Sequence, residues 1–526
     1  MTAAPLMCDA TVATNMPERE VLEFDALVVG GGPAGLAAAI RLRQLDSNIS
    51  VCVIEKGAEV GAHILAGAVL EPRALNELLP DWRDKNAPIK TAVSKDRFWY
   101  LSEKGKWQLP APPQMHNKGN YIVSLGQVVR WLGEQAEGAG ADIFPGFGGA
   151  DVLFGDKGEV CGVITGDAGI GKKGERKASY QPGAELRAKY TIFAEGCRGS
   201  LTQKLLHHYG LNNDSAPQTY AIGIKELWEV PNNNPGEVLH TIGWPLPADT
   251  YGGSFLYHLA PGRIALGFVV GLDYQNPHLS PYMEFQRFKH HPHIARFLRE
   301  GKRIAYGARA LNEGGWQSIP KLAMPGAVLA GCGAGFLNVP KIKGAHTAMK
   351  SGMLAAESVY AAMCSNKQAA VLDDYDAAVR ASWIGEELKA ARNIRPGFGK
   401  NLWLGLANAA LETYVLRGKS PWTFRHHKDH ERTKKAGECK PINYPPPDGK
   451  LSFSRLDNLA YSGVNHEGDQ PPHLQIKDDA VPVKVNLRDY AAPETRYCPA
   501  GVYEFAEEDG EQKLVINAQN CVHCKT

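Results

Sequence analysis

The sequence lacks the features that mark a membrane-spanning, exported or nucleic-acid-binding protein. No window holds about 18 uninterrupted apolar residues, so a spanning helix is not expected. Residues 1–23 have no basic start and no apolar core, and they carry Asp9, Glu18, Glu20 and Glu23, which argues against signal and transit peptides. Net charge is only +2 and no basic run appears, so no nucleic-acid partner is predicted.

A disulfide framework is also missing. Of the ten cysteines, most stand singly, several inside apolar runs such as residues 50–54, which is typical of reduced thiols in a cytosol-like compartment. Cys498, Cys521 and Cys524 form a separate group near the end of the printed sequence. A chain of 526 residues with 44% apolar and 22% charged residues is an ordinary globular protein of two to four domains.

Residues 25–55 predict a strand, a tight glycine turn, a helix and a second strand. The turn Gly30-Gly31-Gly32-Pro33-Ala34-Gly35 fits G-x-G-x-x-G, in which Gly30 allows the turn, Gly32 lets the backbone approach a pyrophosphate and Gly35 lets the helix pack on the strand. The helix start, with Pro33 and Ala34, offers free N–H groups to phosphates. Glu55 ends the second strand, where its carboxylate can accept hydrogen bonds from ribose hydroxyls. The alternative is a glycine turn without a ligand.

Two later glycine-rich elements favour FAD over NAD as the bound dinucleotide. Residues 325–363 again predict a strand, a glycine turn at Gly331 and a helix, and residues 191–200 predict a strand that ends in a glycine turn at Gly196. Such elements occur in this order in two-dinucleotide-binding-motif flavoproteins. We therefore expect Gly196, Gly331 and Asn338 to contact the cofactor, and Asn338 is a candidate hydrogen-bond partner of the flavin ring. Its alternative role is turn formation. Gly67, which lies outside these elements in a string that carries the resemblance described below, is also expected to contact the cofactor.

The three C-terminal cysteines predict an iron–sulfur site. Cys498 precedes a proline, and Cys521 and Cys524 have the C-x2-C spacing of a cluster loop. The third loop ligand would be residue 527, while the printed sequence ends at Thr526, so the fourth cysteine of a [4Fe–4S] site is absent and a shortened chain is favoured. A zinc site that uses His523 and a plain pair of buried thiols are the alternatives.

One apolar segment is typical of a helix that lies on a membrane surface. Residues 401–416 are apolar over about 15 positions, too few to span a bilayer. Lys400 precedes the segment and Arg417 and Lys419 follow it, and it contains Trp403 and Tyr414. Flanking cations and interfacial aromatic residues suit a helix in the interface. A buried core helix is the alternative.

Several long strings resemble one family along essentially the whole chain. The chain resembles the electron-transfer flavoprotein–ubiquinone oxidoreductases. The strings that carry this resemblance are 61–68, 243–246, 250–258, 305–315, 335–344 and 498–505.

The resemblance implies an electron-transferring-flavoprotein dehydrogenase with FAD and one [4Fe–4S] cluster. Such an enzyme takes electrons from reduced electron-transfer flavoprotein and delivers them to ubiquinone, which links fatty-acid and amino-acid oxidation to the respiratory chain. Gly252 and Gly253 match the quinone contact of the family. The cluster is expected to pass electrons to FAD. A monotopic position on the cytoplasmic face of a bacterial inner membrane is expected, and the matrix face of the mitochondrial inner membrane is the alternative.

The expected fold is α/β and α+β: an FAD-binding Rossmann-like domain, an interwoven quinone-binding domain and a C-terminal ferredoxin-like iron–sulfur domain. Tyr503 and Thr526 are candidate hydroxyl donors to the cluster because they lie close to its ligands in sequence. The expected ranges are a flexible arm at 1–24, the FAD-binding domain at 25–230 and 325–395, the quinone-binding domain at 231–324, a membrane-surface segment at 396–437 and the iron–sulfur domain at 438–526.

Two other classes of protein remain possible at this point. A related flavoprotein that uses NAD(P)H would need neither the C-terminal cysteines nor the string Tyr251-Gly252-Gly253. A redox-inactive binding protein that kept FAD but lost its cluster would be excluded by a cysteine at position 527.

Overall fold

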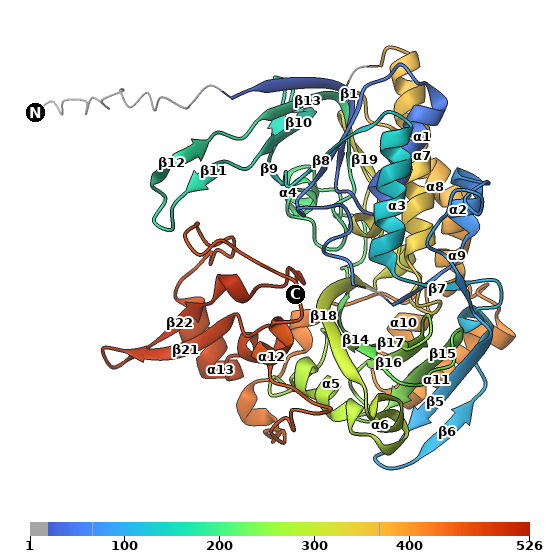
Figure 1. The fold of residues 1–526 in the computed structure, drawn as a ribbon, viewed down its shortest axis with the longest axis vertical. Coiled ribbons are helices and arrows are strands. Elements are labelled where there is room, and N and C mark those ends of the chain that lie inside the picture. The colour runs from blue at the N-terminus through green and yellow to red at the C-terminus, as the bar shows by residue number, and fades with distance from the viewer. Residues whose placement is uncertain (1–18, 66, 368) are drawn as a thin grey trace, which may run out of the picture.

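A sheet built around β1 (Val21–Val29) forms one end of the molecule (Figure 1). The structure is a computed structural model and describes residues 19–65, 67–367 and 369–526. The sheet has eight strands, with the main order β19-β20-β13-β1-β2-β8. β1 pairs in parallel with β2 and β13. The other strands of this sheet are β2 (Val51–Glu55), β8 (Asp142–Pro145), β9 (Gly149–Phe154), β10 (Val160–Thr165), β13 (Glu185–Phe193), β19 (Ala323–Met324) and β20 (Ala327–Leu329).

Helices α1 (Pro33–Leu45), α3 (Leu125–Gly138) and α7 (Ala345–Cys364) pack beside this sheet (Figure 1). Strand residues 26–29 are all apolar and buried, as expected for a parallel strand that is covered on both faces. α1 and α7 cross so closely that a Cβ at Gly352 would lie only 2.0 Å from the Ala34 carbonyl oxygen. The helix–strand alternation therefore produces the Rossmann-like layers that the sequence predicts.

β1 begins earlier than the sequence predicts. The expected flexible arm covered residues 1–24, but Val21 already pairs with Glu185 of β13. Residues 1–18 lie outside the described residues. The prediction was wrong for Val21 to Phe24 because its partner strand lies more than 150 residues away, so no local pattern marks the pairing.

A second sheet of seven strands has the order β18-β14-β17-β16-β15-β5-β6. Helices α5 (Pro281–Lys289) and α6 (Pro292–Leu298) pack on it. Three of its strands, β5, β6 and β14, come from within the range 25–230 expected for the first part of the FAD-binding domain, and β5 pairs in parallel with β15. The strands are β5 (Lys95–Leu101), β6 (Lys106–Leu109), β14 (Tyr220–Glu229), β15 (Glu237–Gly243), β16 (Gly252–His258), β17 (Arg263–Gly271) and β18 (Lys302–Asn312).

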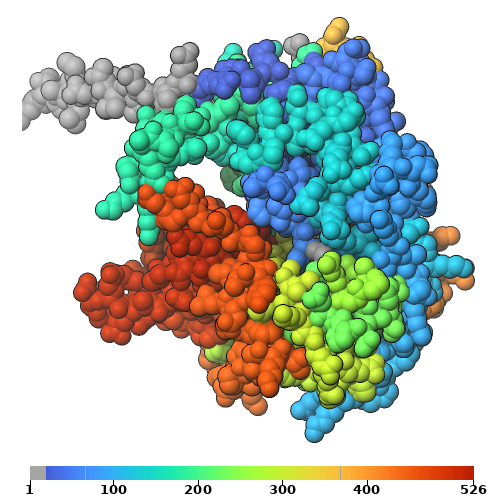
Figure 2. Space-filling model, in the orientation of Figure 1, coloured from blue at the N-terminus to red at the C-terminus, as the bar shows by residue number. Residues whose placement is uncertain are grey.

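The C-terminal region is rich in loops and contains the hairpin β21 (Tyr503–Glu508) and β22 (Glu511–Ile516). A second hairpin, β11 (Ala168–Ile170) and β12 (Arg176–Gln181), lies against this region, and Figure 2 shows it in teal beside the orange and red segments. Lys177 forms ion pairs with Glu467 at 2.6 Å and Asp469 at 3.0 Å. This hairpin therefore joins the FAD-binding part to the C-terminal region.

The remaining elements are short. A small sheet is formed by β3 (Ala68–Leu70), β4 (Thr91–Ala92) and β7 (Tyr121–Val123). The other helices are α2 (Arg73–Leu78), α4 (Ser200–His208), α8 (Asp373–Ala381), α9 (Trp383–Ala391), α10 (Ile394–Gly397), α11 (Leu402–Ala410), α12 (Arg455–Leu459), α13 (Arg488–Tyr490) and α14 (Glu494–Tyr497). None of the helices in the part of the chain described is both long and apolar enough to cross a bilayer.

A fully buried ion pair fastens the C-terminal region to the second sheet. Lys289 Nζ lies 2.9 Å from Glu226 Oε1, and neither side chain is exposed to solvent. Asn458 donates from Nδ2 to the same Glu226 oxygen at 3.0 Å. Burial lowers the pKa of Lys289 to about 8, although the adjacent Glu226 opposes that shift. The pair and Asn458 thus connect β14, α5 and α12.

We expect Lys289→Met to destabilise the protein by about 3–5 kcal/mol, because the substitution leaves the Glu226 carboxylate buried without its cation. Urea unfolding followed by tryptophan fluorescence measures the change. Lys302→Met, at an exposed lysine of β18, is the matched control and should change the free energy of unfolding by less than about 0.5 kcal/mol. Equal midpoints for the two variants would contradict the assigned role of the pair.

Candidate functional site

The first glycine turn is shaped by backbone contacts that exclude side chains. Gly30 has φ +110°, and a Cβ there would lie 2.6 Å from the Ala194 carbonyl oxygen. A Cβ at Gly35 would lie 2.0 Å from the Gly30 carbonyl oxygen. Gly32, the N-cap of α1, faces open space and provides no capping side chain. The free N–H groups in the first turn of α1, to which Ala34 contributes and Pro33 cannot, therefore point toward a position suited to a pyrophosphate.

Glu55 is fixed at the end of β2 beside this turn. Its Oε2 accepts a hydrogen bond from the Gly31 N–H at 3.0 Å, and its Oε1 accepts one from the Gly57 N–H at 2.7 Å. Each carboxylate oxygen keeps a further lone pair, so both remain able to accept bonds from ribose hydroxyls. This position is compatible with a ribose-binding role, and the contact of Glu55 with a ribose stays a prediction.

The other two glycine turns lie against the first. A Cβ at Gly331 (φ +68°) would lie 2.9 Å from the Ala34 Cβ, and one at Gly333 would lie 3.6 Å from the Gly196 carbonyl oxygen. Gly331 donates its N–H to Ser351 Oγ of α7 at 2.9 Å. Gly196 has φ +73°, in the left-handed region that favours glycine. The structure thus brings Gly30, Gly196 and Gly331 together from three distant segments.

Gly67 and Asn338 lie further along the interface between the two sheets. A Cβ at Gly67 would lie 2.2 Å from the Ala265 Cβ of β17, and the Gly67 carbonyl accepts a bond from Lys225 Nζ at 3.0 Å. Asn338 is buried, and its Nδ2 donates to Glu387 Oε2 at 3.2 Å, while its Oδ1 accepts from the Lys341 N–H at 3.3 Å. These bonds suit the alternative role of Asn338 in its turn, and its contact with the flavin ring stays a prediction.

Gly252 and Gly253 begin β16 and are packed against their neighbouring strands. A Cβ at Gly252 would lie 2.3 Å from the Val269 carbonyl oxygen, and one at Gly253 would lie 2.6 Å from the Thr241 carbonyl oxygen. Strand packing by itself therefore requires glycine at both positions. Their contact with a quinone stays a prediction.

The three C-terminal cysteines gather beside the end of β18. Cys498 is buried and packs near Cys521, and the Val502 N–H points at the Cys498 sulfur at 3.4 Å. The His523 N–H points at the Cys521 sulfur, also at 3.4 Å. Burial raises the pKa of the Cys524 thiol to about 11 and also raises that of Cys521. Thiolates at this place therefore need a nearby positive charge, which an iron ion supplies.

Two hydroxyl groups lie beside these sulfur atoms, where they could donate hydrogen bonds to the sulfurs of a cluster. The buried Thr526 hydroxyl has no oxygen or nitrogen partner within the described residues and lies beside the Cys524 thiol. Burial raises the pKa of Tyr503 to about 12, and Cys498, Cys521 and Cys524 add to that shift, which places Tyr503 beside all three. A buried hydroxyl without an oxygen or nitrogen partner and soft thiol ligands fit a cluster, and the chain itself provides Cys498, Cys521 and Cys524 as the ligands.

A group of histidines next to the cluster loop was not predicted from the sequence. The His523 ring lies 5.2 Å from His63, 4.9 Å from His466 and 5.1 Å from His473 between ring centroids. Ligand atoms of His473, Cys521 and His523 all lie within 4.8 Å of one another. This geometry is compatible with the alternative hypothesis of a zinc site that uses His523. Only folding brings His63 to this group, so no spacing in the sequence could have revealed it.

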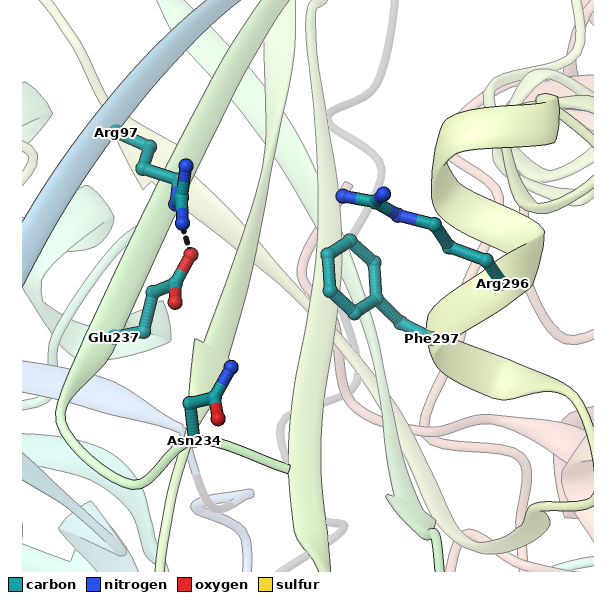
Figure 3. Close-up of a pocket in the computed structure, with 5 residues that line it drawn as sticks. All are labelled: Arg97, Asn234, Glu237, Arg296 and Phe297. Carbon is teal, nitrogen blue, oxygen red and sulfur yellow. Dashed lines mark hydrogen bonds and ion pairs between the residues drawn. The ribbon is translucent and has the colours of Figure 1, made fainter. Parts of the chain in front are cut away.

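A surface pocket of about 320 Å³ lies apart from the glycine turns (Figure 3). It is lined by Arg97, Asn234, Glu237, Arg296 and Phe297. Figure 3 shows Arg97 paired with Glu237 on one wall and Arg296 with Phe297 on the other. Two guanidinium groups and a carboxylate do not suit a benzoquinone ring, and the pocket contains none of the predicted site residues.

Solved structures with a similar fold include flavoproteins. A geranylgeranyl bacteriochlorophyll reductase-like protein from Thermoplasma acidophilum aligns with a TM-score of 0.56 and 22% identity, over 74% of this chain and 88% of that chain. A flavin-dependent brominase aligns with a TM-score of 0.52 and 17% identity, over 76% and 92%. This chain therefore shares its fold with these proteins, and its three glycine turns meet within that fold.

Similarity of sequence identifies the family to which this chain belongs. Family models match residues 220–311 as "ETF-QO, ubiquinone-binding", residues 449–526 as "Electron transfer flavoprotein-ubiquinone oxidoreductase, 4Fe-4S" and residues 28–74 as an NAD(P)-binding Rossmann-like domain. The mitochondrial electron transfer flavoprotein-ubiquinone oxidoreductases of Arabidopsis thaliana and Homo sapiens are each 54% identical, over 96% and 97% of this chain and 81% and 86% of theirs. This chain belongs to that family, which confirms the resemblance, the fold class and both cofactors.

We expect Tyr503→Phe and Thr526→Ala each to lower the reduction potential of the cluster by tens of millivolts. A hydroxyl donor stabilises the reduced, more negative state, so its loss makes reduction harder. An EPR-monitored redox titration of the full-length protein measures the potential. Tyr461→Phe, at an exposed tyrosine, is the control. A potential unchanged in both variants would contradict the placement of these hydroxyls.

Proposed function

We propose that this chain takes electrons from reduced electron-transfer flavoprotein and delivers them to ubiquinone. Membership of the family and the 4Fe–4S and ubiquinone-binding matches support this activity. Bound FAD and a [4Fe–4S] cluster supply the electron-transfer chemistry. The role of the protein itself is to hold the two groups close together.

The contact between the cluster loop and the FAD-binding turns carries this proposal. The Ala310 N–H of β18 donates to the Cys524 carbonyl oxygen at 2.7 Å, and Tyr306 donates from its hydroxyl to the Pro499 carbonyl oxygen at 2.8 Å. The neighbouring Arg309 Nη2 lies 3.3 Å from the Cβ position of Gly196, in a glycine turn of the FAD site. One strand therefore contacts both cofactor sites.

A quinone site at Gly252 and Gly253 is supported by its link to an apolar surface. The Leu402 N–H, at the start of α11, donates to the Ala248 carbonyl oxygen at 2.7 Å, in the turn that precedes β16. The rings of Tyr251 and Phe398 are in edge contact at 5.3 Å. The segment that ends at Gly252 is thus fastened to α11, so a quinone that enters from a membrane at α11 has a short path to the glycine pair.

The surface around α11 has the composition of a membrane-binding face. Trp403 is 57% exposed, Leu404 52% and Tyr414 53%. The exposed Trp107 of β6 joins this face through Tyr100, whose ring lies 5.7 Å from that of Trp107 and 5.4 Å from that of Trp403. We propose that this face, formed by α11 and the β5–β6 hairpin, lies in the membrane interface.

The membrane on which the protein works is an inner membrane in this proposal. The curated relatives are named as mitochondrial, which supports the mitochondrial alternative. The expectation of a bacterial inner membrane has no support from these relatives.

Reduction by the partner flavoprotein tests the proposed function. In stopped-flow mixing, reduced electron-transfer flavoprotein should bleach the flavin absorbance of this protein, and added ubiquinone should restore it. NADH should reduce neither centre. Direct reduction by NADH, or no reaction with the partner flavoprotein in protein that contains both cofactors, would overturn the proposal.

We expect the double substitution Trp403→Ser and Leu404→Ser to weaken liposome binding at least about ten-fold, because it removes two apolar side chains from the membrane-binding face. Turnover with a long-tailed ubiquinone should fall, while turnover with a soluble one-electron acceptor should persist. Flotation with liposomes measures binding. Phe147→Ser, which removes an exposed apolar residue elsewhere, is the control. Equal loss of both activities would favour a structural role for α11.

A further inference from the structure

Three cationic side chains gather beside the glycine turn at Gly196. Arg309 Nη2 lies 3.3 Å from the Cβ position of Gly196. Lys525 Nζ donates to the Arg198 carbonyl oxygen at 3.2 Å. Burial raises the pKa of Cys197, in the same turn, to about 12, while the charges of Arg309, Arg198 and Lys525 oppose that shift. The three cations therefore come from three separate segments: β18, the glycine turn and the cluster loop.

Within the described residues these cations form no ion pair with a carboxylate, although the charge of Glu195 acts on Lys525. Every ion pair within residues 19–65, 67–367 and 369–526 uses other side chains. The nearest acid, Glu195, caps α4 instead, since it accepts bonds from the Thr202 N–H at 2.6 Å and the Thr202 hydroxyl at 2.7 Å. Glu55 is bound to backbone N–H groups. Unpaired cations of this kind, partly removed from water, favour an anionic ligand.

The position of these cations identifies the anion. Gly196 lies beside Gly333, and Ala194 and Glu195 just before it lie against Gly30, so the cations stand near the place where the three glycine turns meet the start of α1. The diphosphate of a bound dinucleotide lies at that place in this fold. We propose that Arg309 and Lys525 bind the diphosphate of FAD, so that the quinone-binding sheet and the iron–sulfur domain complete the FAD site. This inference rests on the FAD of the proposed function.

Such a contact makes FAD binding dependent on the cluster. Lys525 directly follows Cys524, and Arg309 precedes Ala310, whose N–H donates to the Cys524 carbonyl oxygen. A cluster that holds Cys524 also orders Lys525 beside Arg198. Binding free energies are reciprocally linked. If the ordered loop increases the affinity for FAD, bound FAD stabilises the ordered loop by the same free energy. The two cofactors therefore bind with positive cooperativity.

Affinities for FAD and riboflavin separate a diphosphate contact from any other role. We expect Arg309→Gln and Lys525→Gln each to raise the dissociation constant for FAD about ten-fold or more in the full-length protein stripped of flavin. Riboflavin, which has no phosphate, should bind all variants equally. Lys525→Arg, which keeps the charge, should remain near wild type. Quenching of flavin fluorescence measures each constant.

Matched controls and contrary outcomes make this test decisive. Arg299→Gln and Lys513→Gln remove exposed cations elsewhere and should leave FAD affinity unchanged. FAD affinity that is unchanged in both test variants would overturn the inference, as would an equal loss of riboflavin binding. Either result leaves the proposed function intact. Wild-type protein that binds no FAD, or is not reduced by the partner flavoprotein, would instead overturn the function.

Loss of the cluster tests the cooperativity. Cys524→Ser should remove the EPR signal of the reduced cluster and weaken FAD binding as much as Lys525→Gln does, without changing riboflavin binding. The double variant Cys524→Ser with Lys525→Gln should bind FAD no more weakly than either single variant. FAD affinity that stays at the wild-type level in cluster-free Cys524→Ser would overturn the coupling.

Discussion

The close approach of α1 to the turn before it determines where everything else can lie. The Gly30 carbonyl oxygen lies where a side chain at Gly35 would begin. In the same way, the Ala34 carbonyl oxygen lies where a side chain at Gly352 would begin. These contacts fix α1 against the strand behind it and against α7. The start of α1 is thereby presented, with its free N–H groups, to the place where the other glycine turns converge.

β18 joins the separate parts of the site. It runs along the edge of the quinone-binding sheet, and successive residues point to opposite sides. Tyr306 and Ala310 bind the loops that carry the cysteines, while Arg309 lies against the FAD-binding turn. The buried pair of Lys289 and Glu226 then fixes the C-terminal region to the same sheet. The cofactor sites are therefore parts of one continuous interface.

The sequence predicts the local parts of this arrangement well. The glycine turns, Glu55 and the C-terminal cysteines are visible because their chemistry requires fixed residues at short spacings. Contacts between distant segments leave no such pattern. The early start of β1, the pairing of β5 with β15 and the histidine group around His523 each depend on partners far away in the chain. The role of Arg309 is hidden for the same reason, because a lone arginine in a strand has no local signature.

The neighbouring positions of Arg309 and Ala310 in β18 act as a molecular ruler. Their Cα atoms are about 3.8 Å apart, a length fixed by one trans peptide unit. Loops that connect the domains can lengthen or shorten without altering that spacing. An inserted residue within β18 would turn every later side chain to the opposite face of the sheet. Evolutionary change in linker length should therefore be tolerated in this molecule, whereas the length of this single strand should not vary.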